Sequence, residues 1–257
     1  TMLRVANSLL GQEFDDDTLI IGTSGRYEFK NKGIDVFLES LNRLNRDKDL
    51  KKKVLAFVNV PSWVGDPRED LQKRLKSKDK FTEPLQCPFI THWLHNMTHD
   101  QVLDMLKYLG MGNRPEDKVK VIFVPCYQDG HDGILNKHYY DLILGEDLSV
   151  YPSYYEPWGY TPLESVAFRV PTITTDLAGF GLWVNSLKNQ HGINDGVEVL
   201  HRSDYNYSEV ADGIKDTVAL FSTKTEAEIK EIRKRAGQVA EQALWKHFIQ
   251  YYYEAYD

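Results

Sequence analysis

The chain has 257 residues, 42% of them hydrophobic, which is enough for one large core or two small ones. Its formal net charge of −7 argues against nucleic acid or an anionic membrane as a partner, because neither attracts an acidic surface. The two cysteines, Cys87 and Cys126, are far apart and form no CxxC pair, so no disulfide framework or zinc knuckle is indicated and a reducing cytoplasm is the simplest location.

Residues 1–17 are interpreted as a linker or as the end of a missing N-terminal lobe. A short helical pattern after Met2 runs into three acidic residues at positions 15–17. No segment approaches the roughly 18 apolar residues that span a bilayer, and Leu3-Arg4-Val5 lacks the apolar core of a signal peptide. We therefore expect neither a membrane anchor nor export.

Residues 18–224 alternate between short apolar runs and amphipathic stretches such as Ile34–Leu44. The runs are rich in β-branched residues, which is typical of strands buried on both faces. The alternation predicts an α/β fold in which a Rossmann-like parallel sheet carries helices on both faces. The expected strands are Thr18–Gly22, Val54–Val60, Val119–Val124, Leu148–Tyr151, Thr172–Thr175 and Val197–Leu200.

The remaining segments differ in character. Residues 66–80 are strongly charged and predict a solvated helix, whereas residues 84–99 are mixed and aromatic and predict irregular structure. Leu103–Leu109 is again helical. Residues 225–257 have apolar side chains at helical spacing and an unusually aromatic end, so we expect one or two helices that pack back toward the missing lobe.

In an open parallel sheet the ligand lies at the carboxyl ends of the strands, where three loops have unusual residues. The first, Ser24–Gly33, places Arg26 and Lys32 between two glycines. A guanidinium fork and an ammonium charge can together neutralise a diphosphate, the leaving group when a sugar is transferred from a nucleotide. The alternative is a surface loop whose basic residues pair with Glu28 and Asp35.

The second loop has the strongest pattern, Glu156-Pro157-Trp158-Gly159-Tyr160-Thr161-Pro162-Leu163-Glu164. Thr161 before Pro162 predicts a helix cap, which places Glu164 in the first turn near free backbone amides. Glu156 can accept hydrogen bonds from sugar hydroxyls, and Glu164 from both hydroxyls of a ribose. The alternative is a pair of solvated glutamates, although aromatic and proline neighbours are an unfavourable environment for a carboxylate that binds nothing.

The third loop, Asp176–Gly181, predicts a glycine-opened anion nest ahead of a helix over residues 182–187. Glycines let backbone amides approach a phosphate or a sugar closely. Neither this loop nor Ser24-Gly25-Arg26 is a GxGxxG dinucleotide fingerprint.

Three segments, residues 25–33, 151–162 and 174–181, together resemble the C-terminal half of glycogen synthases of the animal and fungal type. The similarity covers residues 19–185 in outline and is weaker outside them. It implies the donor-binding lobe of a two-lobed GT-B glycosyltransferase that transfers glucose, with retention, from a nucleotide donor to the non-reducing end of an α-1,4-glucan. UDP-glucose is favoured over ADP-glucose as donor, the glucan would bind through the missing lobe, and the resemblance allows a homo-oligomer in the full-length enzyme.

The resemblance also assigns residues by position. It implies a catalytic set of Arg26 and Lys32 at the diphosphate and Glu156 near the donor glucose. It makes Glu164 the ribose contact and Tyr139, or the adjacent Tyr140, the residue that stacks on the base. Backbone amides of Thr161 and of residues 179–181 are expected around the phosphates and the sugar. No cofactor and no metal are implied, since the two basic side chains would supply the positive charge. The full donor-binding set is Tyr139, Tyr160, Thr161, Glu164, Gly179, Phe180 and Gly181.

One region departs from the family pattern. Animal and fungal enzymes have an arginine-rich helix that senses glucose 6-phosphate, whereas residues 230–240 here offer only four basic residues, which stand amid Glu226, Glu228, Glu231 and Glu241. That mixture is typical of a solvated helical face. We therefore expect no activation by a sugar phosphate, and a bacterial relative of the family.

Other interpretations stay open on these residues. The fold would also suit a nucleotide-sugar epimerase, a different glycosyltransferase or a non-catalytic nucleotide-sugar-binding module, and paired carboxylates alone would permit a glycoside hydrolase. His92, His95 and His99 have metal-like spacing, but no carboxylate pair accompanies them, so a polar surface loop is favoured over a zinc site. His131-Asp132 is interpreted as a turn.

Overall fold

The computed structural model describes residues 1–256, which form a six-stranded parallel sheet in the order β5-β2-β1-β6-β7-β8. Each of the six predicted strands is present, and β1 extends two residues further than expected. The α/β, Rossmann-like parallel sheet expected from the sequence is therefore confirmed. The strands are β1 (Leu19–Ser24), β2 (Val54–Asn59), β5 (Val119–Val124), β6 (Leu148–Val150), β7 (Thr172–Thr175) and β8 (Val197–Leu200).

Burial on both faces explains why the neighbouring strands β2 and β5 consist almost entirely of apolar residues. Every residue of β2 and of β5 is buried, and the two strands pair in register from Val54 with Val119 to Asn59 with Val124. A strand with helices above and below it has no solvent face, so it shows no polar alternation.

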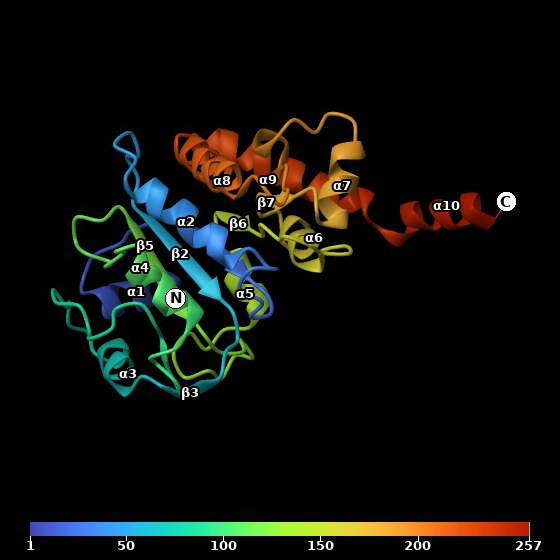
Figure 1. Ribbon diagram of the computed structural model, residues 1–257. Coiled ribbons are helices and arrows are strands. Elements are labelled where there is room, and N and C mark those ends of the chain that lie inside the picture. Colours follow the sequence, from blue (N-terminus) through green and yellow to red (C-terminus); the bar gives the residue numbers. More distant parts are fainter. Residues whose placement is uncertain (257) are drawn as a thin grey trace.

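Two layers of helices enclose the sheet (Figure 1). One layer holds α2 (Ile34–Asn45), α4 (Gln101–Tyr108) and α8 (Tyr207–Ser222), which share a core with the side chains of one sheet face. The other holds α1 (Met2–Leu10), α3 (Glu69–Lys76) and α5 (Tyr139–Leu144). At the β7–β8 end, a separate core joins α6 (Tyr160–Ala167), α7 (Gly179–Ser186) and α9 (Glu226–Gln242).

The interpretation of residues 1–17 as a linker does not describe their first part. Met2, Val5 and Leu9 of α1 are buried in one cluster with Leu55 and Phe57 of the sheet. The apolar face of this helix therefore belongs to the core of the same domain.

The region between β2 and β5 also differs from the expectation. The strand β3 (Val64–Pro67) pairs with β4 (His92–Leu94), so the charged helix begins only at Glu69 and residues 84–99 are not wholly irregular. The fully buried Arg68 organises this insertion by donating hydrogen bonds to the carbonyls of Gln86, Cys87 and Ile90. These contacts are long-range, so local periodicity does not reveal them.

The C-terminal segment contains two helices, as expected. Thr225 and Glu228 form a capping box that starts α9, which packs on α6. The following helix, α10 (Trp245–Tyr256), has no buried residue and extends away from the body of the molecule (Figure 1). A short 3-10 helix, η1 (Ile193–Asp195), precedes β8. Within residues 1–256, no helix combines the length and apolarity needed to cross a bilayer.

The strand order reverses between β1 and β6, because the chain first builds outward through β2 and β5 and then returns to β6 on the other side of β1. A crevice forms at such a switch point outside the carboxyl ends of the strands. The loops that follow β1 and β6, residues 25–33 and 151–159, leave the sheet at this place.

Candidate functional site

The loops after β1 and β6 meet through an ion pair between Lys32 and Glu156. The Lys32 ammonium lies 2.5 Å from Glu156 Oε2, and only 14% and 20% of the two side chains are exposed. The Tyr154 amide donates to the Asn31 carbonyl at 2.8 Å, which joins the two loops a second time. Two of the three expected catalytic residues are therefore held together at the switch point.

Gly33 makes this close approach of the loops feasible. Its φ of 69° lies in the left-handed region, where it serves as the N-cap of α2. An added Cβ would overlap the carbonyl oxygen of Pro152 on the neighbouring loop. Any side chain at this position would push the Lys32 loop away from the Glu156 loop.

The Glu156 loop is fixed from its other side by the start of α7. The Gly179 amide donates to the Glu156 carbonyl at 3.1 Å, and the Phe180 amide donates to the Trp158 carbonyl at 2.7 Å. The expected donor contacts of Gly179 and Phe180 stay a prediction: without a ligand, both amides bond to the carbonyls of the neighbouring loop, which a phosphate or a sugar would have to displace. Gly181 lies one residue further along α7, where an added Cβ would overlap the Thr175 carbonyl.

The start of α6 also differs from the expectation. Gly159, with a φ of 109°, is the N-cap, so the helix begins at Tyr160 and Thr161 is its second residue instead of its cap. Pro162 is tolerated in this first turn because its missing N–H would have no partner within the helix. Glu164 consequently lies two residues further into the helix than the sequence indicates, and the Tyr160 side chain is exposed.

A cavity of about 340 Å³ opens beside these loops at the carboxyl ends of β1, β2 and β5. Tyr139 and Thr161 line it, so the structure brings two of the expected donor-binding residues to one hollow. The other lining residues are Ser24, Gly25, Asn59, Pro61, Cys126, Tyr127, Gln128 and Asp129.

The two adjacent tyrosines have different surroundings. The Tyr139 hydroxyl lies 2.8 Å from Ser24 Oγ, and burial raises the pKa of Tyr139 to about 12. Tyr140 is half exposed and donates to Glu164 Oε1 at 3.3 Å. Burial raises the pKa of Glu164, and the hydrogen bond from Tyr140 opposes this rise. Of the two candidates for base stacking, Tyr139 is the one that lines the cavity.

Arg26 does not line the cavity, and its side chain extends into solvent. Its side chain is 80% exposed, and its Nε lies 3.3 Å from Glu28 Oε1. The pairing with Glu28 is the alternative that the sequence left open. An exposed, loosely paired guanidinium can still swing toward an anion, since such a pair contributes little free energy.

Sequence reasoning did not find the amide pair at the back of the cavity. Gln128 Nε2 donates to Asn59 Oδ1 at 3.0 Å, and the two residues lie 69 positions apart. Asn59 ends β2, and Gln128 follows β5. A polar side chain at the carboxyl end of an otherwise apolar strand is the feature that points to such a residue.

His92 is buried, which corrects the expectation of a polar surface loop. Its ring nitrogens lie 2.8 Å from Thr91 Oγ1 and 2.8 Å from the Asp132 carbonyl. The Asp132 carboxylate accepts hydrogen bonds from three backbone amides of the turn that follows it. His92 and Asp132 also lie near Cys126, but the histidine and the carboxylate already have protein partners, so the group is a structural turn.

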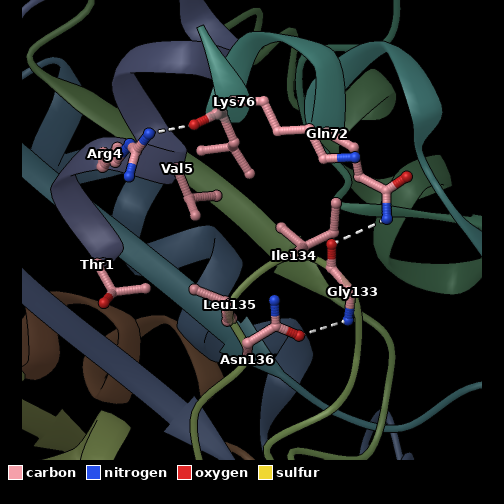
Figure 2. Close-up of a pocket in the computed structure, with 10 residues that line it drawn as sticks. Thr1, Arg4, Val5, Gln72, Lys76, Gly133, Ile134, Leu135 and Asn136 are labelled. Carbon is pink, nitrogen blue, oxygen red and sulfur yellow. Dashed lines mark hydrogen bonds between the residues drawn. The ribbon is translucent and has the colours of Figure 1, made fainter. Parts of the chain in front are cut away.

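A second hollow, of about 320 Å³, lies between α1, α3 and the turn at residues 133–136 (Figure 2). Arg4 donates to the Leu75 carbonyl across it, and Gln72 donates to the Gly133 carbonyl. None of the expected site residues lines this hollow.

Comparisons with known proteins agree with this arrangement. The family model described as glycogen synthase matches residues 10–78 and 68–257. The glycogen [starch] synthase of Neurospora crassa is 28% identical over 296 residues, which cover 93% of this chain and 41% of that protein. The glycogen [starch] synthase of Caenorhabditis elegans is 32% identical over 243 residues, which cover 74% of this chain and 36% of that protein. The chain thus spans about two fifths of the length of these relatives.

Similar folds occur among solved structures. The structure described as OtsA apo structure superposes with a TM-score of 0.50 at 13% sequence identity, covering 88% of this chain and 40% of that one. At this identity the likeness concerns the fold alone, and it agrees with the expected fold class.

Proposed function

This chain belongs to the glycogen synthase family, and we propose that it is the donor-binding half of an enzyme that transfers glucose from a nucleotide-glucose donor to an α-1,4-glucan. The observation that carries the proposal is the Lys32–Glu156 pair beside a cavity lined by Tyr139. A cationic group for a phosphate, a carboxylate for a sugar and an aromatic ring for a base are the three parts that a nucleotide sugar requires.

In the proposed complex the diphosphate lies at Lys32. The negative charge that develops on the diphosphate as the glycosidic bond breaks is stabilised by the Lys32 ammonium, and Arg26 swings in from solvent to add a bidentate contact. Because these charges are basic side chains, we propose that the reaction needs no metal ion. Glu156, released from its ion pair, accepts hydrogen bonds from the hydroxyls of the donor glucose.

The nucleoside occupies the cavity. Tyr139 supplies a ring face for the base, and Glu164, which follows the lining residue Thr161 by three positions in α6, is the carboxylate that we assign to the ribose hydroxyls. Uridine is the base we propose, by the resemblance, ahead of adenine. The Asn59–Gln128 amide pair offers hydrogen-bonding groups to the edge of either base.

The acceptor side of the reaction is also part of the proposal. The matched relatives are more than twice as long as this chain, so we propose that the glucan binds through a second lobe and that the 257-residue chain alone binds donor without efficient transfer. The free thiols of Cys87 and Cys126 suit the proposed cytoplasmic location.

Calorimetry with UDP, ADP and their glucose conjugates tests the proposal. The wild-type chain should bind UDP, and Lys32→Ala should weaken binding by about tenfold or more, the loss expected for a charge-assisted contact. Lys30→Ala is the matched control, because Lys30 is an exposed lysine of the same loop. No heat with any of these ligands from a folded sample, or an equal effect of both substitutions, would contradict the donor-binding role.

A further inference from the structure

A buried carboxyl group lies directly beneath the cavity. Alternate residues of a strand point to the same face of the sheet. Gly22 and Ser24 of β1 therefore share one face. Ser149 of β6 and Tyr151, which follows this strand, do the same. Gly22 pairs with Ser149. The Glu146 side chain fills the space that these small residues leave, and its Oε2 accepts from Ser149 Oγ at 2.6 Å. A Cβ at Gly22 would overlap Glu146 Oε1, so only a glycine at this position leaves room for the carboxyl group.

Polar side chains connect Glu146 with the cavity wall. The Tyr151 hydroxyl lies within hydrogen-bonding reach of Ser149 on one side and of Ser24 on the other. Ser24 Oγ in turn lies 2.8 Å from the Tyr139 hydroxyl. Ser24 and Tyr139 both line the cavity. Neighbouring hydroxyl groups therefore lead from a fully buried acid to two residues that would contact the nucleotide.

Burial favours the neutral form of Glu146 at neutral pH. Burial raises the pKa of Glu146 to about 8, and the hydrogen bond from Ser149 only partly opposes this rise. The other charged group that acts on it is the neighbouring Asp147, whose negative charge also raises the pKa of Glu146. Tyr139 and Tyr151 face the same region as neutral phenols, since burial raises the pKa of each hydroxyl well above neutrality. Loss of the Glu146 proton thus creates a buried negative charge without a cationic partner among the groups that act on it.

We propose that Glu146 is a positioning residue for the nucleotide, which holds Tyr151, Ser24 and Tyr139 in place as a neutral acid and releases that arrangement when it ionises. The inference rests on the proposed function, because it assumes that the cavity holds a nucleoside diphosphate. Ionised Glu146 weakens binding in two ways: it needs new hydrogen-bond donors, which only a rearranged network supplies, and it repels the diphosphate.

The affinity for UDP as a function of pH tests this proposal. We expect the wild-type chain to bind UDP about tenfold more weakly at about pH 9 than at about pH 7, a change of the size usual for two coupled sites. The phosphates of UDP are already ionised at neutral pH, but the uracil N3–H begins to lose its proton at about pH 9. This change in the ligand affects every variant alike, so each variant is compared with the wild type at the same pH. Glu146→Gln keeps the shape and the acceptor for Ser149 but cannot ionise, so it should lose much less affinity than the wild type over the same range.

Two further variants complete the experiment. Glu198→Gln is the matched control, because burial also raises the pKa of the half-buried Glu198 carboxyl, but this residue lies in β8 and accepts from the Ile193 amide. It should keep the wild-type pH profile. Tyr151→Phe removes the hydroxyl in the middle of the route, so its alkaline loss should shrink, and it serves as the test should Glu146→Gln fail to fold.

The outcomes separate this inference from the proposed function. Absence of UDP binding at neutral pH by the folded wild-type chain overturns both. Binding at neutral pH with the same alkaline loss in the wild type and in Glu146→Gln, or in the wild type and in Tyr151→Phe, overturns the positioning role alone. A wild-type affinity that does not change with pH also overturns it.

Discussion

Replacement of Glu146 by glutamine should change how the stability of the protein depends on pH. Burial raises the pKa of Glu146 from its ordinary 4.5 to about 8 in the folded chain. Between these two values the folded protein keeps a proton that the unfolded chain releases, so the free energy of unfolding falls as the pH rises. The contribution of this group is complete below about pH 4.5 and is lost as the pH passes through 8. Glutamine carries no such proton and removes this dependence.

The size of the effect follows from the same shift. Each pH unit between the two pKa values costs about 1.4 kcal/mol, and the slope halves where the folded group is half ionised, so the wild type loses about 3 kcal/mol of stability from this group by pH 7 and about 4 kcal/mol by pH 8. Urea unfolding, followed by tryptophan fluorescence at several pH values, measures the difference between Glu146→Gln and the wild type. Acids with a raised pKa that do not act on Glu146, such as Asp35 and Glu198, titrate alike in both proteins and cancel. A difference that stays constant to within about 0.5 kcal/mol between about pH 5 and about pH 8 would refute the reasoning.

Three further substitutions give distinct expectations. Arg26→Ala should weaken UDP binding by about tenfold while leaving the unfolding temperature unchanged, because the side chain is exposed and contributes little to the fold. Calorimetry and a thermal melt measure the two quantities. Unchanged binding, or a lowered unfolding temperature, would contradict this expectation. Gly33→Ala should cost clearly more stability than Gly110→Ala, since both glycines have a φ of 69° but an added Cβ overlaps the Pro152 carbonyl only at Gly33; denaturant unfolding of the pair should separate the overlap from the backbone cost of about 1 kcal/mol, and equal losses would count against the loop contact. Tyr139→Ala should lose about 1–3 kcal/mol of UDP binding and Tyr139→Phe much less, because stacking needs the ring; fluorescence titration distinguishes them, and a loss as large in phenylalanine would assign the role to the hydroxyl.

The sheet could be predicted from the sequence because burial on both faces leaves a local record. Val54–Asn59 and Val119–Val124 are almost wholly apolar, broken only by Asn59 and Lys120, and both strands are completely buried. The insertion between them was harder to predict, since Arg68 is charged and is buried not only by its local ion pair with Asp70 but by three carbonyl partners 18 to 22 positions further along. A charged residue in a polar stretch is ordinarily solvated, so its burial depends on contacts that no local pattern shows.

The site was predicted in its parts but not in its contacts. The residues Lys32 and Glu156 are 124 positions apart, and only the fold shows that they form an ion pair before any ligand arrives. The glycine-rich start of α7 resembles an anion nest locally, yet the amides of Gly179 and Phe180 bond to the Glu156 loop. No local pattern indicates that Glu146 is buried, because its carboxyl group occupies the space beside Gly22, which lies on a different strand.

A structure of the chain crystallised with UDP is the most direct test of the donor-binding role. The account predicts that the base lies in the cavity against Tyr139 and that the diphosphate contacts Lys32, with the Lys32–Glu156 pair opened. Nucleotide bound instead in the hollow between α1 and α3, with Lys32 still paired to Glu156, would contradict it (Figure 2).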